Sequence, residues 1–316
     1  MLSRRLIRIK VLQILYAWSR KSDSTIQQAG RELKTSLERS YQMFFLILML
    51  LFDLVDHAAG RIQLGREKKM PTWDELHPNE RFVHNRVIRD LREHEGVKKI
   101  IRDQSLGWKD HAVLLKKLYN ALTATEAYRE YMEHPRDDYK NDQAIVKYIL
   151  SELLPASEDL QASLEEQSIY WNDELEFILS ALIRFADLFP ARKGRRITLP
   201  PMFKSKEDEQ FAMDLLHKSI LHREEYTGLI EQHTKNWEVD RIARLDMLIL
   251  IQAITEILNF PDIPVRVSIN EYIEIAKYYS TDKSAVFVNG ILDKIVADLR
   301  KEEKIRKEGR GLIGEV

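Results

Sequence analysis

Three arginines near the start of the chain have a spacing that favours binding to a phosphate backbone. If residues 4–20 form one helix, Arg4, Arg5 and Arg8 fall within an arc of about 100°, whereas Lys10 lies elsewhere. Positive side chains in the first turns oppose the helix macrodipole, and a negatively charged partner would reverse that penalty. Arginine suits RNA because its planar fork grips phosphates and stacks on unpaired bases. The pattern therefore indicates a nucleic-acid site; the alternative is the solvated start of an amphipathic helix.

Two aromatic residues follow on the same predicted helix, and the remaining charge is sorted along the chain. Tyr16 and Trp18 could offer faces on which unpaired bases stack. The net charge is only −1, from 49 basic and 50 acidic residues, so a global field does not select nucleic acid as a partner. A second basic cluster lies at residues 192–196. Local clusters, and not the overall charge, thus point to a nucleic-acid partner.

Residue types that carry catalysis or hold metals form no convincing set. The chain has no cysteine, which excludes disulfides, a thiol nucleophile and thiolate metal sites. The GxGxxG match at 309–314 lacks the strand before it and the helix after it that a phosphate site needs, so we expect a frayed tail. Asp74/His77 and Asp214/His217 have the spacing of helical ligand pairs, but we expect a linker and a surface pair. The sequence predicts no cofactor, no metal and no enzyme.

Composition favours an all-α protein. The 316 residues include only eleven glycines and nine prolines, which leaves little material for tight turns and favours long helices. The longest apolar run, Met43–Phe52, is about half the length needed to span a bilayer, so we expect a buried helix and no membrane segment. Basic residues interrupt the apolar N-terminal stretch, which argues against a signal peptide. We therefore expect a cytoplasmic protein.

Hydrophobic periodicity and prolines divide the chain into helices and connectors. We expect helices over residues 4–20, 24–59, 79–105, 109–133, 140–154, 157–189, 206–234, 238–259, 265–279 and 282–304. Gly60 is the expected stop of the second helix, residues 65–80 form a linker, and the proline-rich basic stretch 190–205 is the best candidate boundary. Residues 245–251 are nearly all apolar, which predicts a central position in the core.

Both ends of the chain resemble one protein family. The segment RRLIRIKVLQILYAW at residues 4–18 is similar to the opening of the NusB transcription antitermination proteins. The stronger match lies in the C-terminal part, where three segments follow the order and spacing of that family. They are WEVDRIARLDMLILIQAITEIL (237–258), DIPVRVSINEYIEIAKYYS (262–280) and FVNGILDKI (287–295).

The resemblance implies NusB-like helical bundles with an additional inserted helical region. It implies N-terminal NusB-like helices at 1–59, an inserted region of unknown role at 60–202, a C-terminal NusB-like bundle at 203–304 and a tail at 305–316. The inserted region has no counterpart in short family members. It could cover the partner surface, add a second one, or replace the partner by mimicry.

The resemblance also implies an RNA-binding protein that is not an enzyme. Family members pair with ribosomal protein NusE, and the heterodimer binds the boxA element of nascent RNA. The pair acts within the RNA polymerase antitermination complex, notably on ribosomal RNA operons. Some members self-associate, so a homodimer without the partner is a further expectation.

Carried over by position, the family motifs assign candidate binding residues. The expected RNA-binding residues are Arg4, Arg5, Arg8, Lys10, Gln13, Tyr16, Lys283, Phe287 and Asn289. Asp246 falls where the family usually has an acid near the junction of RNA and partner, so it is the expected partner-binding residue. Asn270 and Glu271 are expected to be structural and to tie helix ends.

Departures from the family pattern keep other functions open. Ile251 and Thr255 replace an arginine and a tyrosine that are frequent in the family, and Lys283 stands where many members carry an acid. Lys283 would strengthen nonspecific RNA attraction. The main alternative is a helical protein–protein adaptor that keeps the fold but not RNA binding. A NusB-like domain of an RNA methyltransferase and a catalytic centre within residues 60–200 are weaker alternatives.

Overall fold

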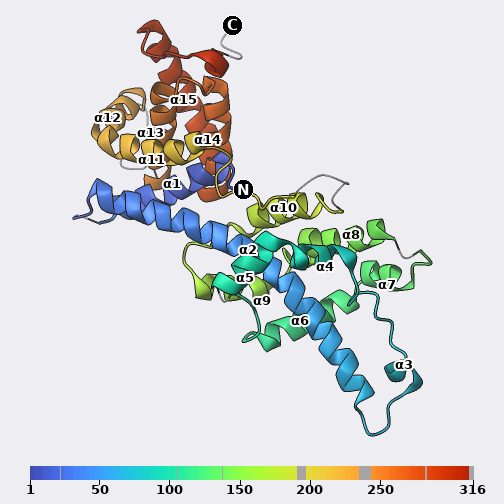
Figure 1. Cartoon of the computed structure of the whole chain (residues 1–316). Helices are drawn as coiled ribbons and strands as arrows, with labels where there is room; N and C mark the ends of the chain where they lie inside the picture. Colours follow the sequence, from blue (N-terminus) through green and yellow to red (C-terminus); the bar gives the residue numbers. More distant parts are fainter. Residues whose placement is uncertain are drawn as a thin grey trace. The chain divides into compact units, whose positions relative to one another are not determined.

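The computed structural model shows a helical protein (Figure 1). It describes residues 1–21, 23–104, 106–136, 138–190, 197–234, 243–281 and 283–312, without the side chains of residues 103 and 104. Every regular element among these residues is a helix, which confirms the all-α prediction.

The chain divides into two compact units, which we name by their place in the sequence. The terminal unit comprises residues 2–37 and 203–316, and the central unit comprises Met1 and residues 38–202. One boundary between the units falls at 202/203. The other boundary falls at 37/38 and not at 59/60, because the apolar part of the second helix is buried in the core of the central unit.

The terminal unit is a helical bundle around α13. Its elements are α1 (Arg4–Ser19), the first turns of α2 (Ile26–Arg66), α11 (Lys206–Leu221), α12 (Arg223–His233), α13 (Arg244–Asn259), α14 (Val265–Tyr279), α15 (Ser284–Lys301) and the short 3-10 helix Gly309–Leu312. Helix α13 packs against α1, α11, α12, α14 and α15. Because it has neighbours on all sides, residues 248–257 are all buried, the polar Gln252, Thr255 and Glu256 included. The apolar pattern at 245–251 predicts this central position.

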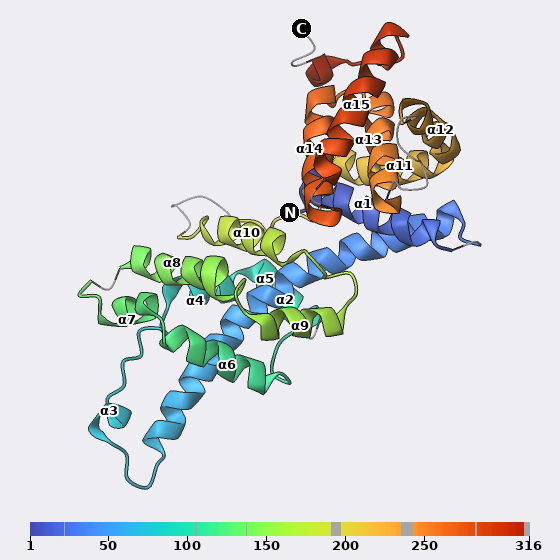
Figure 2. The ribbon, with the colours of Figure 1, turned by 180° about the vertical axis from the view of Figure 1, so that it is seen from behind.

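The central unit surrounds the middle of α2. Its further elements are α3 (Trp73–Leu76), α4 (Arg86–Glu93), α5 (Glu95–Gln104), α6 (Ala112–Thr123), α7 (Glu126–Glu133), α8 (Tyr139–Tyr148), a π-helical turn (Ile149–Leu153), α9 (Glu158–Gln167) and α10 (Leu175–Ala186). Figure 2 shows most of these short helices gathered along the long α2, whereas α3 lies apart from them in the connection that follows α2.

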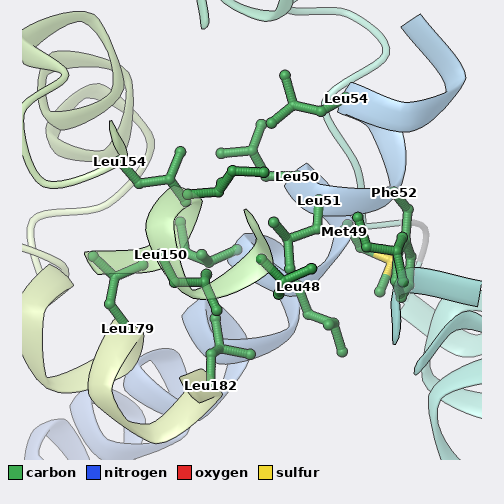
Figure 3. Packing of buried hydrophobic residues seen from close by; sticks show 14 of the residues in the cluster. Leu48, Met49, Leu50, Leu51, Phe52, Leu54, Leu150, Leu154, Leu179 and Leu182 are labelled. Atoms are coloured by element: carbon green, nitrogen blue, oxygen red, sulfur yellow. The ribbon is translucent and has the colours of Figure 1, made fainter. Parts of the chain in front are cut away.

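Leucines of α2 form the core of the central unit. Leu50 and Leu51 lie in one cluster with Leu150 of the π-helical turn, Leu154 directly after that turn and Leu182 of α10 (Figure 3). By length and composition α2 could cross a membrane, but 72% of its most apolar stretch is buried inside the structure. The run is apolar on every face because protein covers every face, as expected for a core helix.

Several long expected helices are broken into shorter ones. Asn85, Thr125 and Ser157 each accept a hydrogen bond from a backbone N–H and start a new helix inside or at the edge of an expected one. Helix α2 instead runs past the expected stop at Gly60, where an added side chain would meet open space. The expected beginning of α13 at residue 238 lies outside the described residues.

Candidate nucleic-acid interface

Helix α1 is exposed only at its two ends. Ser3 caps its N-terminus by accepting a hydrogen bond from the backbone N–H of Leu6, and Arg4 and Arg5 follow directly. Residues 6–12 are all buried in the terminal unit. Side chains become partly accessible again at Gln13 and Tyr16. The expected strip is therefore two accessible patches, about 16 Å apart along the helix axis between Arg5 and Tyr16.

Arg8 lies inside the terminal unit, where Glu256 of α13 holds it. Arg8 donates from Nε and Nη2 to the two Glu256 oxygens at 2.7 Å each, and both side chains are at most 3% exposed. Glu256 also accepts hydrogen bonds from Ser268 Oγ at 2.7 Å and Tyr272 Oη at 3.0 Å. Burial alone would lower the pKa of Arg8, but the Glu256 carboxylate outweighs it and raises that pKa above its ordinary value. The pair thus forms a satisfied polar network in the core.

Arg5 lies at the surface and is held by Glu271 of α14. Its Nε and Nη2 donate to the two Glu271 oxygens at 2.9 and 2.8 Å. The Arg5 side chain is 44% exposed, and that of Glu271 is 20% exposed. The hydrogen bonds from Arg5 and the charge of Arg8 outweigh the effect of burial and hold the pKa of Glu271 below its ordinary value. Within the described part of the chain, two of the five N–H groups of the Arg5 guanidinium are therefore engaged, and its other edge is open to an anion or a base.

Arg4 is the third member of the cluster and forms an ion pair with Asp208. Its Nε donates to Asp208 of α11 at 2.8 Å, and its guanidinium lies 5.1 Å from the centroid of the Phe211 ring. The Arg4 side chain is 41% exposed. Arg4 and Arg5 thus present partly accessible guanidinium forks. Like the buried Arg8, each of them also pairs with a carboxylate.

The structure changes the expected role of Arg8 and Lys10. Arg8 is 3% exposed and Lys10 is fully buried, because the middle of α1 packs inside the bundle. Gln252 of α13 also donates from Nε2 to the backbone oxygen of Arg8 at 2.9 Å. Neither side chain can reach a strand bound at the surface, so both are structural in this arrangement.

Tyr16 is the accessible aromatic residue of the second patch. Its side chain is 41% exposed, while Gln13 is half-buried. Trp18 donates from its indole nitrogen to the backbone oxygen of Ser24 at 2.8 Å, and the Arg223 guanidinium lies 5.7 Å from the Trp18 ring centroid. Tyr16 is therefore better placed than Trp18 to stack on a base.

The expected residues of α15 lie at its first turns. Lys283 precedes the helix and is exposed, whereas Phe287 and Asn289 are half-buried. Asn289 donates from Nδ2 to Asp293 at 3.3 Å. The first turn of α15 lies at the lower end of the bundle in Figures 1 and 2, the end at which α1 also lies.

Asp246 differs from its expected role at a partner surface. It is 6% exposed, and its Oδ2 accepts a hydrogen bond from Ser284 Oγ at 2.8 Å. This contact joins the first turn of α13 to the first turn of α15. Its Oδ1 is buried and has no hydrogen-bond partner in the described part of the chain. A buried carboxylate cannot contact a partner directly, so Asp246 positions the start of α15 instead.

The carboxylates that face the arginines were not expected as site residues. Glu271 was expected to tie helix ends, and it instead bonds Arg5 on another helix. No nearby sequence pattern predicts a role for Asp208 or Glu256, because each contacts its arginine only through the packing of separate helices. Among the described residues, no group of three or more His, Asp or Glu could hold a metal ion.

Comparisons with known proteins point to one family. A family model described as the NusB family matches residues 198–297. Transcription antitermination protein NusB of Salinibacter ruber is 44% identical over 114 residues, which cover 36% of this chain and 71% of that protein. The protein of the same name from Desulfatibacillum aliphaticivorans is 39% identical over 143 residues, or 45% of this chain and 91% of that protein.

A third relative is matched over less of its length. The Chloroherpeton thalassium protein with the same name is 42% identical over 105 residues, and the match spans 33% of this chain and half of that protein. No solved structure matches this chain.

Proposed function

Since the chain belongs to the NusB family, we propose that it is a transcription antitermination factor that binds boxA-like single-stranded RNA. In this proposal it acts in the cytoplasm with ribosomal protein NusE and supports transcription of ribosomal RNA operons. It is a binding protein and not an enzyme.

One observation carries the RNA-binding part of the proposal. Arg4 and Arg5 present partly accessible guanidinium forks at the start of α1, while the network around Arg8 fixes the helix in the bundle. Arginine forks suit phosphates and the edges of unpaired bases. A helix held by buried contacts keeps such forks in place without ordering them during binding.

The other expected residues extend the contact surface. Tyr16 offers a ring for stacking, with Gln13 beside it, and Lys283, Phe287 and Asn289 at the start of α15 provide a cation, a second ring and an amide. Arg8, Lys10 and Asp246 support this surface from inside. If about four to six phosphates are neutralised, log K against log salt should fall with a slope of roughly −3 to −4.

The test is RNA binding with and without NusE at two salt concentrations. A boxA oligonucleotide is compared with a scrambled control of equal length, using the full chain, the Arg5→Ala variant and an Arg129→Ala variant. Arg129 is a matched control because it is an exposed arginine of the central unit that pairs with Glu126 at 2.9 Å. We expect Arg5→Ala to weaken boxA binding and Arg129→Ala to leave it unchanged. A salt slope near zero would refute the electrostatic mechanism.

A specific observation favours the adaptor as second candidate. Each of Arg4, Arg5 and Arg8 faces a carboxylate, which reduces the positive field that attracts RNA. An adaptor would bind NusE, and boxA RNA would add no affinity to that complex.

A further inference from the structure

Glu271 lies between an arginine of the core and an arginine of the surface. Its Oε2 is 3.6 Å from Arg8 Nη1, and its two oxygens accept the bonds from Arg5 at 2.8 and 2.9 Å. Arg8 is in turn held by Glu256 through two bonds. The four side chains therefore form a row of alternating charge that runs from α13 through α1 and α14 to the accessible fork of Arg5.

We propose that Glu271 is a positioning residue that determines RNA specificity by fixing the Arg5 fork so that its free edge meets an acceptor pair on an unpaired base. This inference rests on the proposed function and adds a role for an acidic residue in it. The surface arginine then acts through directed hydrogen bonds more than through its charge.

The geometry supports positioning because both ends of the contact are fixed. A side chain as long as arginine loses rotamer freedom when it binds, and a contact made before binding removes part of that loss. Glu271 engages Nε and one Nη2 hydrogen, so the edge formed by Nη1 and the second Nη2 hydrogen stays available. Glu271 itself is steadied by the buried Arg8, which keeps the fork from rotating.

The charges of the two ion pairs explain why Glu271 would affect specificity more than overall affinity. The Arg5 and Glu271 charges cancel, as do those of Arg8 and Glu256. Nonspecific RNA binding depends almost entirely on net positive charge. An arginine fork whose charge is cancelled adds little affinity for a random strand. Because the fork is held in one orientation, it can still form a bidentate contact with the correct base, and such a contact discriminates between bases.

Three substitutions separate positioning from charge. Glu271→Asp keeps the charge but is one methylene too short to hold both nitrogens of Arg5. Glu271→Gln loses the charge and one acceptor. Glu274→Gln removes one charge from the same helix at a residue whose ion-pair partner is Lys277. Each full-length variant is tested for binding to the boxA and scrambled oligonucleotides, and its thermal unfolding is recorded in parallel.

We expect the ratio of boxA to scrambled affinity to fall about five- to tenfold in Glu271→Asp and Glu271→Gln, and to stay unchanged in Glu274→Gln. The salt slope should steepen by about 0.7 in both Gln variants, which each gain one net positive charge, and stay constant in the Asp variant.

In an Arg5→Ala background, Glu271→Asp should have no further effect on the ratio of boxA to scrambled affinity. Arg5→Lys, which changes only an exposed side chain, should reproduce the lost discrimination if a Glu271 variant unfolds.

The outcomes distinguish this inference from the proposed function. If the unaltered protein discriminates boxA and both Glu271 variants keep that ratio, the positioning role is overturned while RNA recognition stands. An equal loss in Glu274→Gln would also overturn it, since charge alone would then explain the effect. If the unaltered protein binds neither RNA, the proposed function and this inference both fail.

Discussion

Arg8 and Glu256 form an ion pair with two hydrogen bonds of 2.7 Å inside the terminal unit. The residues are 248 positions apart in the sequence and belong to helices α1 and α13. The pair fixes the first helix of the chain against the central helix of the bundle. An arginine expected at an RNA surface is thus part of the interior.

Arg8→Ala should destabilise the terminal unit by about 3–5 kcal/mol, because Glu256 would remain as a buried charge without its partner. Arg4→Ala removes only a partly exposed pair and should change the free energy of unfolding by about 1 kcal/mol or less. Denaturant unfolding followed by far-ultraviolet circular dichroism measures both. Equal stability of the two variants would contradict the structural role of Arg8.

Tyr16→Ala should weaken RNA binding by about 1–3 kcal/mol, because the partly exposed ring would no longer stack on a base. Tyr16→Phe keeps the ring and should retain the affinity, which makes it the matched control. Fluorescence anisotropy with a labelled boxA oligonucleotide measures the difference. If Tyr16→Phe loses as much affinity as Tyr16→Ala, the hydroxyl and not stacking is responsible.

The contact between Arg5 and Glu271 should make stability depend on pH in the acidic range. The folded pKa of Glu271 lies below its ordinary value near 4.5, so the folded state favours the ionised carboxylate. The resulting stabilisation is complete above that ordinary value and is lost as pH falls through the lower folded pKa. Urea unfolding from pH 7 to pH 3 should therefore show the gap between the unaltered protein and Glu271→Gln narrowing below about pH 4.5. A gap that widens on acidification would refute the direction of this shift.

Leu50→Ala should cost the central unit about 2–5 kcal/mol, because the substitution leaves a cavity among the leucines of Figure 3. Leu64→Ala makes the same chemical change on the same helix at a residue that is 68% exposed, and should stay within about 0.5 kcal/mol. Hydrogen exchange should show faster exchange of the central-unit amides in Leu50→Ala than in Leu64→Ala. Similar protection in both variants would show that the run at 43–52 is not the core of this unit.

Gly311→Ala should detach the tail from the terminal unit. An added Cβ at Gly311 would lie 1.8 Å from the backbone oxygen of Pro261, which also accepts a hydrogen bond from the Glu308 N–H at 3.1 Å. Trypsin should then cleave near Lys307 and Arg310 faster than in the unaltered protein. Gly228→Ala, where an added Cβ meets open space, is the control and should leave the cleavage rate unchanged. An unchanged rate in Gly311→Ala would mean that the tail does not depend on this contact.

Local patterns were sufficient for the helical class and for the location of the core segments. The apolar stretch 245–251 predicts a helix covered on all sides, and α13 is such a helix. The run Met43–Phe52 predicts a buried helix, and α2 places it in the core of the central unit. Breaks at single capping residues such as Thr125 were missed, because the hydrophobic period continues across them.

The sequence by itself determined the helical class, the family resemblance and the cluster of three arginines, because these depend on residue types and on spacings within one segment. Only the tertiary structure decided that Arg8 is buried while Arg4 and Arg5 are accessible, since this depends on which helices cover each face of α1. It also decided that Glu256 and Glu271 hold these arginines from 248 and 266 residues away. Spacing along one helix predicts the face on which a side chain lies, but only the packing of the helices determines which residue it contacts.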